Sequence, residues 1–282
     1  MDYEGLKNWK FDDVDATYTE RETMIYALGL GLGADPVDAA QLRFVTETEL
    51  RALPTLSNVV ARAPSWLPKV GVRVTDAVHG EHRMIFDRPL PPAGRLRAPT
   101  RLTGIVDKGP GRGMLVIVEQ EIFDATTGER CATSTITNFI RGAGGFGGPT
   151  SGAATPHTIP ERPPDASDRF ATIPQQALNY RLSGDRNPLH FDPAVARAAG
   201  FPRPILHGFC TYGIAGWQIL KNFCGYDPAR LAALDVRFAA PALPGETLVT
   251  EFWRDGDIIS FRTTVAERGV VVLANGRAVI RG

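Results

Sequence analysis

Hydrophobic and polar residues alternate along long stretches of both halves of the chain. A sheet with one buried face produces this period of two. We therefore expect strands over residues 78–86, 101–107, 114–123 and 131–140 in the first half, and over 232–239, 246–255, 257–267 and 269–280 in the second. Weaker strand-like patterns cover 44–46 and 70–76, and Gly80 interrupts the first of the clear strands.

Helical spacing of hydrophobic residues predicts a helix over 20–33, opened by a capping box of Thr19 and Glu22. Three glycines weaken its C-terminal end. Residues 35–42 are expected to be a loop or a short helix. In the second half, the same spacing and the flanking Pro, Asp and Gly residues predict helices over 174–183, 193–199 and 207–223.

The two halves resemble each other in how their strands begin and end. Residues 92–96 (Pro-Ala-Gly-Arg-Leu) open strands that finish at an Arg-Gly pair, and residues 244–248 (Pro-Gly-Glu-Thr-Leu) open strands that finish at another. We interpret this as an internal duplication of an α+β unit, a curved antiparallel sheet wrapped on a helix. Gly, Pro, Ser and Thr dominate 142–168, which we expect to be a linker between domains at 1–141 and 169–282.

A short stretch between two predicted helices carries a carboxylate, an amide and an imidazole within six residues: Asp185, Asn187 and His190. Gly184 supplies the left-handed conformation that ends the first helix, and Pro188 keeps Asn187 extended. Each of the three is an ordinary turn residue by itself. Together on a stiff connector, with a His-Gly pair following at 207–208, they point to catalysis.

Composition narrows the possible partners. The 282 residues carry a formal net charge of zero, which favours neither nucleic acid nor an anionic membrane. The three cysteines, Cys131, Cys210 and Cys224, are widely spaced and expected to be reduced and buried, as in the cytoplasm. We find no signal peptide, no run of membrane-spanning length and no C-terminal peroxisomal Ser-Lys-Leu signal.

The stretch 180–190, Tyr-Arg-Leu-Ser-Gly-Asp-Arg-Asn-Pro-Leu-His, is followed by Ile-Leu-His-Gly-Phe-Cys-Thr-Tyr-Gly at 205–213. This resembles the hydratase 2 motif of MaoC-like (R)-specific enoyl-CoA hydratases, in the form found in the hydratase 2 domain of peroxisomal multifunctional enzymes. The resemblance covers nearly the whole chain and implies two hot-dog folds. Since the motif occurs only in the second half, it also implies one active site per chain, with a substrate cavity shaped by the first half.

The implied activity is reversible hydration of a trans-2-enoyl-CoA to a (3R)-3-hydroxyacyl-CoA in fatty-acid or related metabolism. Asp185 and His190 would bind one water and move its protons, and Asn187 would orient the water or the substrate. A pocket that excludes solvent would raise the pKa of Asp185. Gly208, at the start of a helix, is the candidate backbone donor to the thioester oxygen, and His207 is expected to be structural.

Further substrate-binding candidates follow from the same resemblance: His79, Gly80, Lys108, Arg186, Pro188, Leu189 and Phe238. Lys108 could pair with a coenzyme A phosphate or be a solvated turn residue, and Phe238 could be an ordinary core aromatic. We reject a metal site at His79 and His82 because a third ligand is missing nearby. No cofactor is expected, since coenzyme A enters with the substrate, and a homodimer is common for such folds.

Two other functions remain open at this stage. One is a hot-dog acyl-CoA thioesterase, which would direct water at the thioester carbonyl. The other is a non-catalytic acyl-CoA-binding subunit, which the intact Asp185, Asn187 and His190 disfavour. Simple fatty, steroid and polyketide acyl groups are all compatible with the sequence, as are both directions of the reaction.

Overall fold

The computed structural model describes residues 3–73 and 76–282. The helices and strands of the first half are α1 (Tyr3–Lys7), β1 (Val14–Tyr18), α2 (Glu20–Gly29), α3 (Ala39–Leu42), α4 (Ser57–Val60), β2 (Ala77–Phe86), β3 (Gly94–Ala98), β4 (Thr100–Asp107), β5 (Met114–Asp124) and β6 (Arg130–Ile140). Those of the second half are β7 (Ala166–Ala171), α5 (Gln176–Tyr180), α6 (Pro193–Ala198), α7 (Gly208–Phe223), β8 (Leu231–Phe238), β9 (Thr247–Asp255), β10 (Ile258–Val265) and β11 (Val270–Ile280). Short 3₁₀ helices are η1 (Pro54–Leu56), η2 (Leu67–Val70), η4 (Arg181–Ser183), η5 (Pro188–His190) and η6 (Pro228–Arg230).

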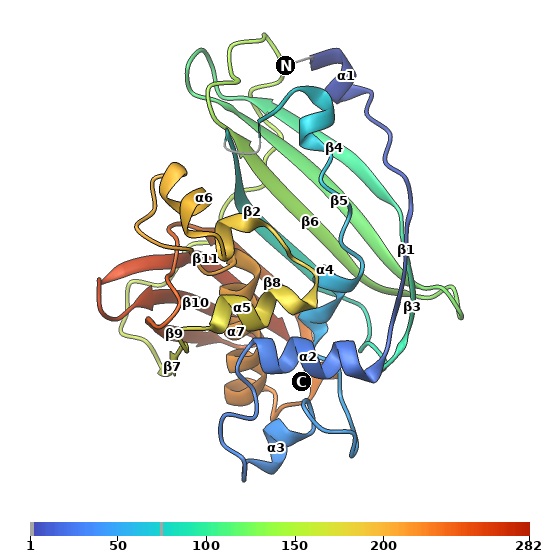
Figure 1. Cartoon of the computed structure of the whole chain (residues 1–282), viewed down its shortest axis with the longest axis vertical. Helices are drawn as coiled ribbons and strands as arrows, with labels where there is room; N and C mark the ends of the chain where they lie inside the picture. Colours follow the sequence, from blue (N-terminus) through green and yellow to red (C-terminus); the bar gives the residue numbers. More distant parts are fainter. Residues whose placement is uncertain (1–2, 74–75) are drawn as a thin grey trace.

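Within these described ranges, the strands form one antiparallel sheet of 11 strands (Figure 1). Its order is β1-β3-β5-β6-β2-β8-β11-β10-β9-β7, with β4 paired to β5. Counted inward from the two edges, the strands correspond as β1 to β7, β3 to β9, β5 to β10, β6 to β11 and β2 to β8. Within each half, the corresponding strands follow one another along the chain in the same sequence, apart from the additional strand β4. This symmetry agrees with the internal duplication expected from the sequence. The two half-sheets join where β2 pairs with β8, with Met84 opposite Leu234.

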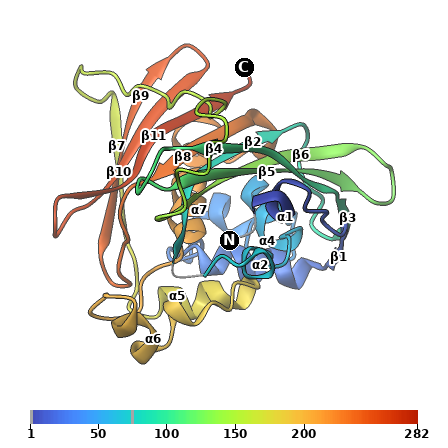
Figure 2. The same ribbon diagram turned by 90° about the horizontal axis from the view of Figure 1, so that it is seen from above.

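The helices lie on one face of the sheet, which arches over them (Figure 2). Helix α7 is at the centre, and its residues from Phe209 to Leu220 are all buried. One cluster of buried side chains includes residues of α2, α5 and α7 and of strands from both halves. The two halves therefore share a core, and side chains from both can be held in fixed positions around a common site.

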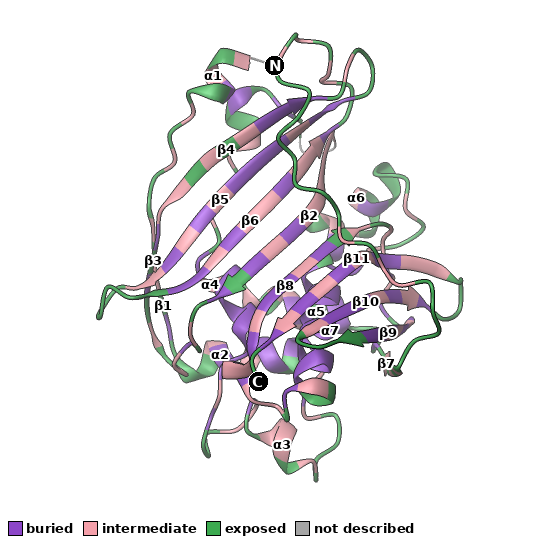
Figure 3. Ribbon diagram, turned by 180° about the vertical axis from the view of Figure 1, so that it is seen from behind, coloured by how far each residue is buried: buried purple, intermediate pink, exposed green. Residues whose placement is uncertain are grey.

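The opposite face of the sheet is crossed by residues 141–165, which contain neither helix nor strand (Figure 3). Arg83 donates to the carbonyl oxygen of Thr155 at 3.5 Å, and Asn275 donates to that of His157 at 2.7 Å. A polar cavity of about 480 Å³ lies between this segment and β2, β8 and β11. The predicted linker, 142–168, thus runs over the sheet and ends inside a strand, since β7 begins at Ala166.

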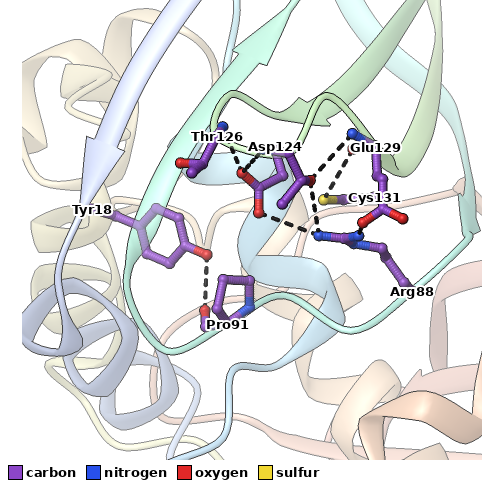
Figure 4. Close-up of polar contacts among 8 residues, drawn as sticks. Tyr18, Arg88, Pro91, Asp124, Thr126, Glu129 and Cys131 are labelled. Atoms are coloured by element: carbon purple, nitrogen blue, oxygen red, sulfur yellow. Dashed lines mark hydrogen bonds and ion pairs between the residues drawn. The ribbon is translucent and has the colours of Figure 1, made fainter.

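Polar contacts hold the turn of the hairpin between β5 and β6 in the first half (Figure 4). Asp124 accepts the backbone N–H groups of Thr126 and Thr127 at 2.7 and 3.2 Å, and Arg88 pairs with both Asp124 and Glu129. Nearby, the Tyr18 hydroxyl donates to the Pro91 carbonyl at 2.8 Å. These contacts tie β1 and the hairpin to the connection between β2 and β3.

Two further expectations concern the whole chain. The three cysteines are buried and free of disulfides, as predicted. Throughout residues 3–73 and 76–282, no helix combines the length and the apolar character that crossing a membrane requires.

The structure corrects several predicted elements. Helix α2 ends at Gly29 rather than at residue 33, because Gly31 and Gly33 take positive φ angles of 87° and 80°. Residues 44–46 lie in turns and bends rather than a strand, and the described part of 70–76 contains the end of η2 and no strand. Residues 74–75 of that prediction lie outside the described residues. The short strands β1, β3 and β7 were not expected.

The first half also differs from the expected sheet wrapped on a helix. In the second half the 16-residue helix α7 precedes β8, whereas only η1 and α4 take the corresponding place before β2. Pro64 follows shortly after α4, and it lacks a backbone N–H and disfavours a helical conformation at Ala63. The first half therefore lacks a counterpart of α7 among its described residues.

Two glycines of α7 allow the helix to pack closely against its neighbours. A Cβ added at Gly213 would lie 2.7 and 2.8 Å from the terminal carbons of Leu30 and 3.0 Å from the Tyr26 hydroxyl. A Cβ added at Gly216 would lie 3.3 Å from side-chain carbons of Leu234 and Thr55. A side chain at Gly213 would therefore collide with Tyr26 of α2 and with Leu30, which directly follows that helix.

We expect Gly213→Ala to lower the free energy of unfolding by about 1–3 kcal/mol, because fully buried Leu30 has little room to move. Gly216→Ala is the matched control: it adds the same methyl group to the same helix, with the same gain in helix propensity, but meets looser contacts. Denaturant unfolding of the three proteins measures the difference. Equal stability of Gly213→Ala and the parent would contradict this packing.

Candidate active site

The predicted catalytic stretch lies in the connection between α5 and α6. Gly184 takes a φ of 124° directly after η4, and Asn187 is extended at φ −60° and ψ 123° before Pro188. The Asn187 side-chain oxygen accepts the N–H of Leu189 at 3.1 Å and so caps η5. This capping role accounts for the oxygen of Asn187 and leaves its NH₂ group available to a ligand.

Asp185 is held at the boundary between the two halves of the chain. Its side chain is 13% exposed and forms an ion pair with Arg62, which follows α4 in the first half. Its other oxygen accepts the backbone N–H of Asn187 at 3.2 Å. The carboxylate is therefore fixed from both halves.

His190 and His207 lie beside Asp185 with their rings stacked, 3.7 Å between centroids. His190 donates from Nδ1 to the carbonyl oxygen of Ile205 at 3.0 Å, which leaves Nε2 as the acceptor nitrogen of the neutral ring. His207 donates from Nε2 to the backbone oxygen of Asp185 at 3.1 Å, the structural contact expected of it. A carboxylate oxygen of Asp185 and one ring nitrogen of each histidine lie within 4.8 Å of one another.

The electrostatics differ from the prediction for Asp185. Burial does raise its pKa, but the charge and hydrogen bond of Arg62, with His207 and the Asn187 N–H, outweigh burial and hold the pKa below its ordinary value. The expectation of a raised pKa is therefore wrong, because it took no account of Arg62. Burial lowers the pKa of His190, and burial with the neighbouring His190 lowers that of His207 to about 3. At neutral pH the site holds an ionised carboxylate and two neutral imidazoles.

Gly208 is the first residue of α7 and is exposed. Among the described residues, no acceptor lies within hydrogen-bonding distance of its N–H or of the N–H of Phe209. Helix N-termini favour negative charge at such free N–H groups. A Cβ added at Gly208 would lie 3.2 Å from the Phe238 ring, so a side chain would crowd the approach to this end of the helix.

Rings from both halves pack against one another at the N-terminal end of α7, and the first half contributes His79. The His79 ring centroid lies 4.6 Å from that of Phe238 and 4.8 Å from that of Phe209. Gly80 forms a bulge in β2, where a Cβ would lie 3.2 Å from the Thr137 carbonyl oxygen. Beside them His82 is fully buried and hydrogen-bonds through Nε2 to Asn58 at 3.1 Å. The structure therefore brings His79, Gly80 and Phe238 to the N-terminal end of α7.

The other predicted substrate residues lie farther out. Arg186 and Pro188 are exposed and Leu189 is half-buried on the same connection as Asp185. Lys108 is on the turn between β4 and β5, three strands away from β2 in the sheet, or about 14 Å at ordinary strand spacing. The structure does not bring Lys108 into contact with the Asp185 site.

Asp185, His190 and His207 are residue types that also bind metals. Here Arg62 already places a positive charge against the Asp185 carboxylate, and a second cation at the same oxygens would be repelled. One nitrogen of each histidine is also occupied with a carbonyl oxygen. These contacts disfavour a metal ion at the three side chains.

The sequence gives no signal for Arg62. It lies 123 positions before Asp185 outside any motif, and its neighbours in sequence are alanines. The buried pair of Asn58 and His82 is similarly long-range. Only the folded structure reveals these contacts.

Comparison with known proteins identifies both halves. Residues 16–142 match the MFE-2 hydratase 2 N-terminal domain, and residues 156–275 match the MaoC like domain. The chain is 38% identical over 269 residues to the enoyl-CoA hydratase ChsH3 of Mycobacterium tuberculosis, covering 93% of each chain. It is also 38% identical over 281 residues to the peroxisomal multifunctional enzyme type 2 of Mus musculus, of which it spans 37%.

Solved structures agree with this comparison. A MaoC-like dehydratase from Phytophthora capsici superposes with a TM-score of 0.88 at 34% identity, covering 100% of this chain and 99% of the other. A Mycobacterium tuberculosis protein with a double hot-dog fold gives a TM-score of 0.60 at 16% identity, with 97% and 96% covered, and supports the fold alone. The α+β double hot-dog fold expected from the sequence is thus confirmed. The chain belongs to the MaoC-like hydratase 2 family, with the N-terminal domain type of MFE-2.

Proposed function

We propose that this protein catalyses the reversible hydration of a trans-2-enoyl-CoA to a (3R)-3-hydroxyacyl-CoA. The observation that carries the proposal is the cluster of Asp185, His190 and His207 within 4.8 Å, placed directly before the free N-terminus of α7. The names of the relatives as enoyl-CoA hydratases support the same reaction, and the family supplies the stereochemistry.

Asp185 and His190 would hold the attacking water. The carboxylate is ionised and the Nε2 of neutral His190 is an acceptor, so a bridging water can donate one hydrogen to each group. A carboxylate oxygen of Asp185 and a ring nitrogen of His190 lie within 4.8 Å of each other, a gap that two hydrogen bonds of about 2.8 Å can span. The lone pairs of the water oxygen are then free to attack C3 of the substrate.

The bond changes balance with one water. The C3–O bond forms as one O–H bond breaks, and the electrons of the double bond move to C2 while negative charge builds on the thioester oxygen. The proton taken by Asp185 or His190 then returns to C2. The N–H of Gly208 and the N-terminal end of α7 would stabilise the charged oxygen, and stabilisation of this kind is often what lowers the barrier of such reactions most.

The remaining residues would position the substrate. The free NH₂ of Asn187 would orient the water or the thioester, and His79, Gly80 and Phe238 would line the thioester position. Residues 1–141 would shape the cavity and 169–282 would carry the chemistry. Arg186, Pro188 and Leu189 would border the entrance, and Lys108 would meet a coenzyme A phosphate at the periphery.

We further propose a homodimer without a separate cofactor, in which coenzyme A enters as part of the substrate. Three buried free thiols are typical of a reducing compartment and support a cytoplasmic location.

Loss of the enoyl-thioester absorbance from crotonyl-CoA and longer enoyl-CoAs, with chiral analysis of the product, tests this function. We expect a 3-hydroxyacyl-CoA of R configuration and no release of thiol. Thiol release without loss of the double bond would instead indicate the thioesterase.

We expect Asp185→Asn and His190→Ala each to lower kcat for hydration by about 10²–10⁴-fold, since each removes an acceptor for the bridging water. Asp13→Asn and His157→Ala remove the same groups on other elements, at a surface ion pair with Arg97 and on the segment behind the sheet. These two controls should retain parental rates. Near-parental rates in both site variants, with their folds intact by circular dichroism, would rule out the assigned roles.

The active form needs neutral His190 and ionised Asp185, and the pKa of each lies below its ordinary value. Hydration should therefore be lost only as the pH falls through these lowered values. We expect kcat/KM to stay constant from about pH 8 to about pH 6.5, the ordinary value for histidine, and to decline below it. A half-maximal rate at pH 6.5 or above would contradict this protonation state.

A further inference from the structure

Arg62 is the only residue that joins the two halves by an ion pair, among the residues described. Its partner is Asp185, and all other ion pairs lie within residues 13–130 or within 162–277. The Arg62 side chain is 44% exposed, whereas that of Asp185 is 13% exposed. Arg62 therefore reaches from the solvent edge of the first half to a largely buried carboxylate.

Arg62 is also the only cation that forms an ion pair with this carboxylate among the described residues. The titratable and charged groups that face Asp185 are Arg62 after α4, His79 on β2, Tyr180 on α5, His190 on η5 and His207 before α7. Burial, followed by the charge of Arg62, lowers the pKa of His79 to about 3, and burial lowers those of the other two histidines. The imidazoles are thus neutral, and Tyr180 stays protonated because burial raises its pKa.

A carboxylate in such a place needs a counter-charge. Burial without one shifts the equilibrium toward the protonated acid, which cannot accept a proton from water. The Arg62 guanidinium supplies that charge. Its central carbon lies 5.8 Å from the ring centroid of Phe209, the residue that directly follows Gly208.

We propose that Arg62 is a positioning residue of the reaction centre, which keeps the Asp185 carboxylate ionised and fixed across the boundary between the two halves. This inference rests on the proposed hydration. It adds a residue of the first half, outside the hydratase 2 motif, to the groups that the reaction requires.

The geometry leaves Asp185 free to act. One carboxylate oxygen takes the guanidinium and the other takes the Asn187 N–H. An ionised carboxylate has about four acceptor sites, so each oxygen retains one for the water. Arg62 therefore holds the charge of Asp185 without using up its capacity to accept a proton.

The pH profile of hydration distinguishes this role from a merely structural one. Arg62→Gln keeps the length and a hydrogen-bonding group but removes the charge, so the pKa of Asp185 should rise. We expect the acid side of the kcat/KM profile to move upward by about one pH unit or more, which is about a tenfold loss of rate on that side. Arg62→Lys keeps a positive charge and should restore most of the parental profile.

Arg43→Gln is the matched control. Arg43 has a similar exposure, 45%, and pairs with Glu49 at 3.0 Å within the first half. This variant should leave the profile unchanged. An Arg62→Gln profile that coincides with those of the parent and of Arg43→Gln would overturn the proposal.

A second measurement needs no turnover and so separates this inference from the proposed function. The Arg62–Asp185 pair stabilises the fold only while Asp185 is ionised. The Tm difference between the parent and Arg62→Gln should be full above the raised carboxyl pKa of the variant and shrink as the pH falls toward the lowered pKa of the parent. In an Asp185→Asn background this pH-dependent difference should vanish. Its persistence there would refute the pairing, whereas failure of the parent to hydrate any enoyl-CoA would refute only the function.

Discussion

The site depends on keeping one carboxylate charged in a place that is mostly shielded from water. Asp185 is surrounded by imidazoles that burial keeps neutral, so they contribute hydrogen-bonding atoms but no positive charge. The compensating positive charge comes from Arg62, which reaches the carboxylate from the other half of the chain. The ionised state of Asp185 and the neutral state of His190 are both consistent with this distribution of charge.

Such a contact requires the two halves to be held rigidly together. The continuous sheet does this through the pairing of β2 with β8, and the shared core of α2, α5 and α7 completes it. The symmetric strand order means that each half builds the same framework. Within the described residues, only the second half contains a helix as long as α7, whose N-terminus faces the site. In the first half α4 has four residues, and Arg62 follows it and reaches Asp185.

The sequence predicts the parts of the site that are locally determined. Gly184, Asn187 and Pro188 set the local backbone conformation, and the structure contains each of them as expected. Likewise, the predicted ends of the long strands with clear alternation differ from the observed ends by no more than two residues. Recognition of the family supplies the fold and the reaction.

Other features depend on contacts between distant residues. The strands β1 and β7 lie at the edges of the sheet and have only five and six residues, so each is too short for its alternation to indicate a strand by itself. The pKa of Asp185 could not be predicted from burial, since its direction depends on a guanidinium 123 positions away. Lys108 matches a family position, yet its turn lies three strands from the strand of His79.

In the proposed mechanism, a single water between Asp185 and His190 delivers its hydroxyl group and its proton from one side of the double bond. Hydration of an enoyl-CoA in D₂O, followed by NMR of the 3-hydroxyacyl product, measures this directly. We expect deuterium at C2 and oxygen at C3 to have been added to the same face of the double bond. Addition to opposite faces, or a random distribution of deuterium at C2, would contradict it.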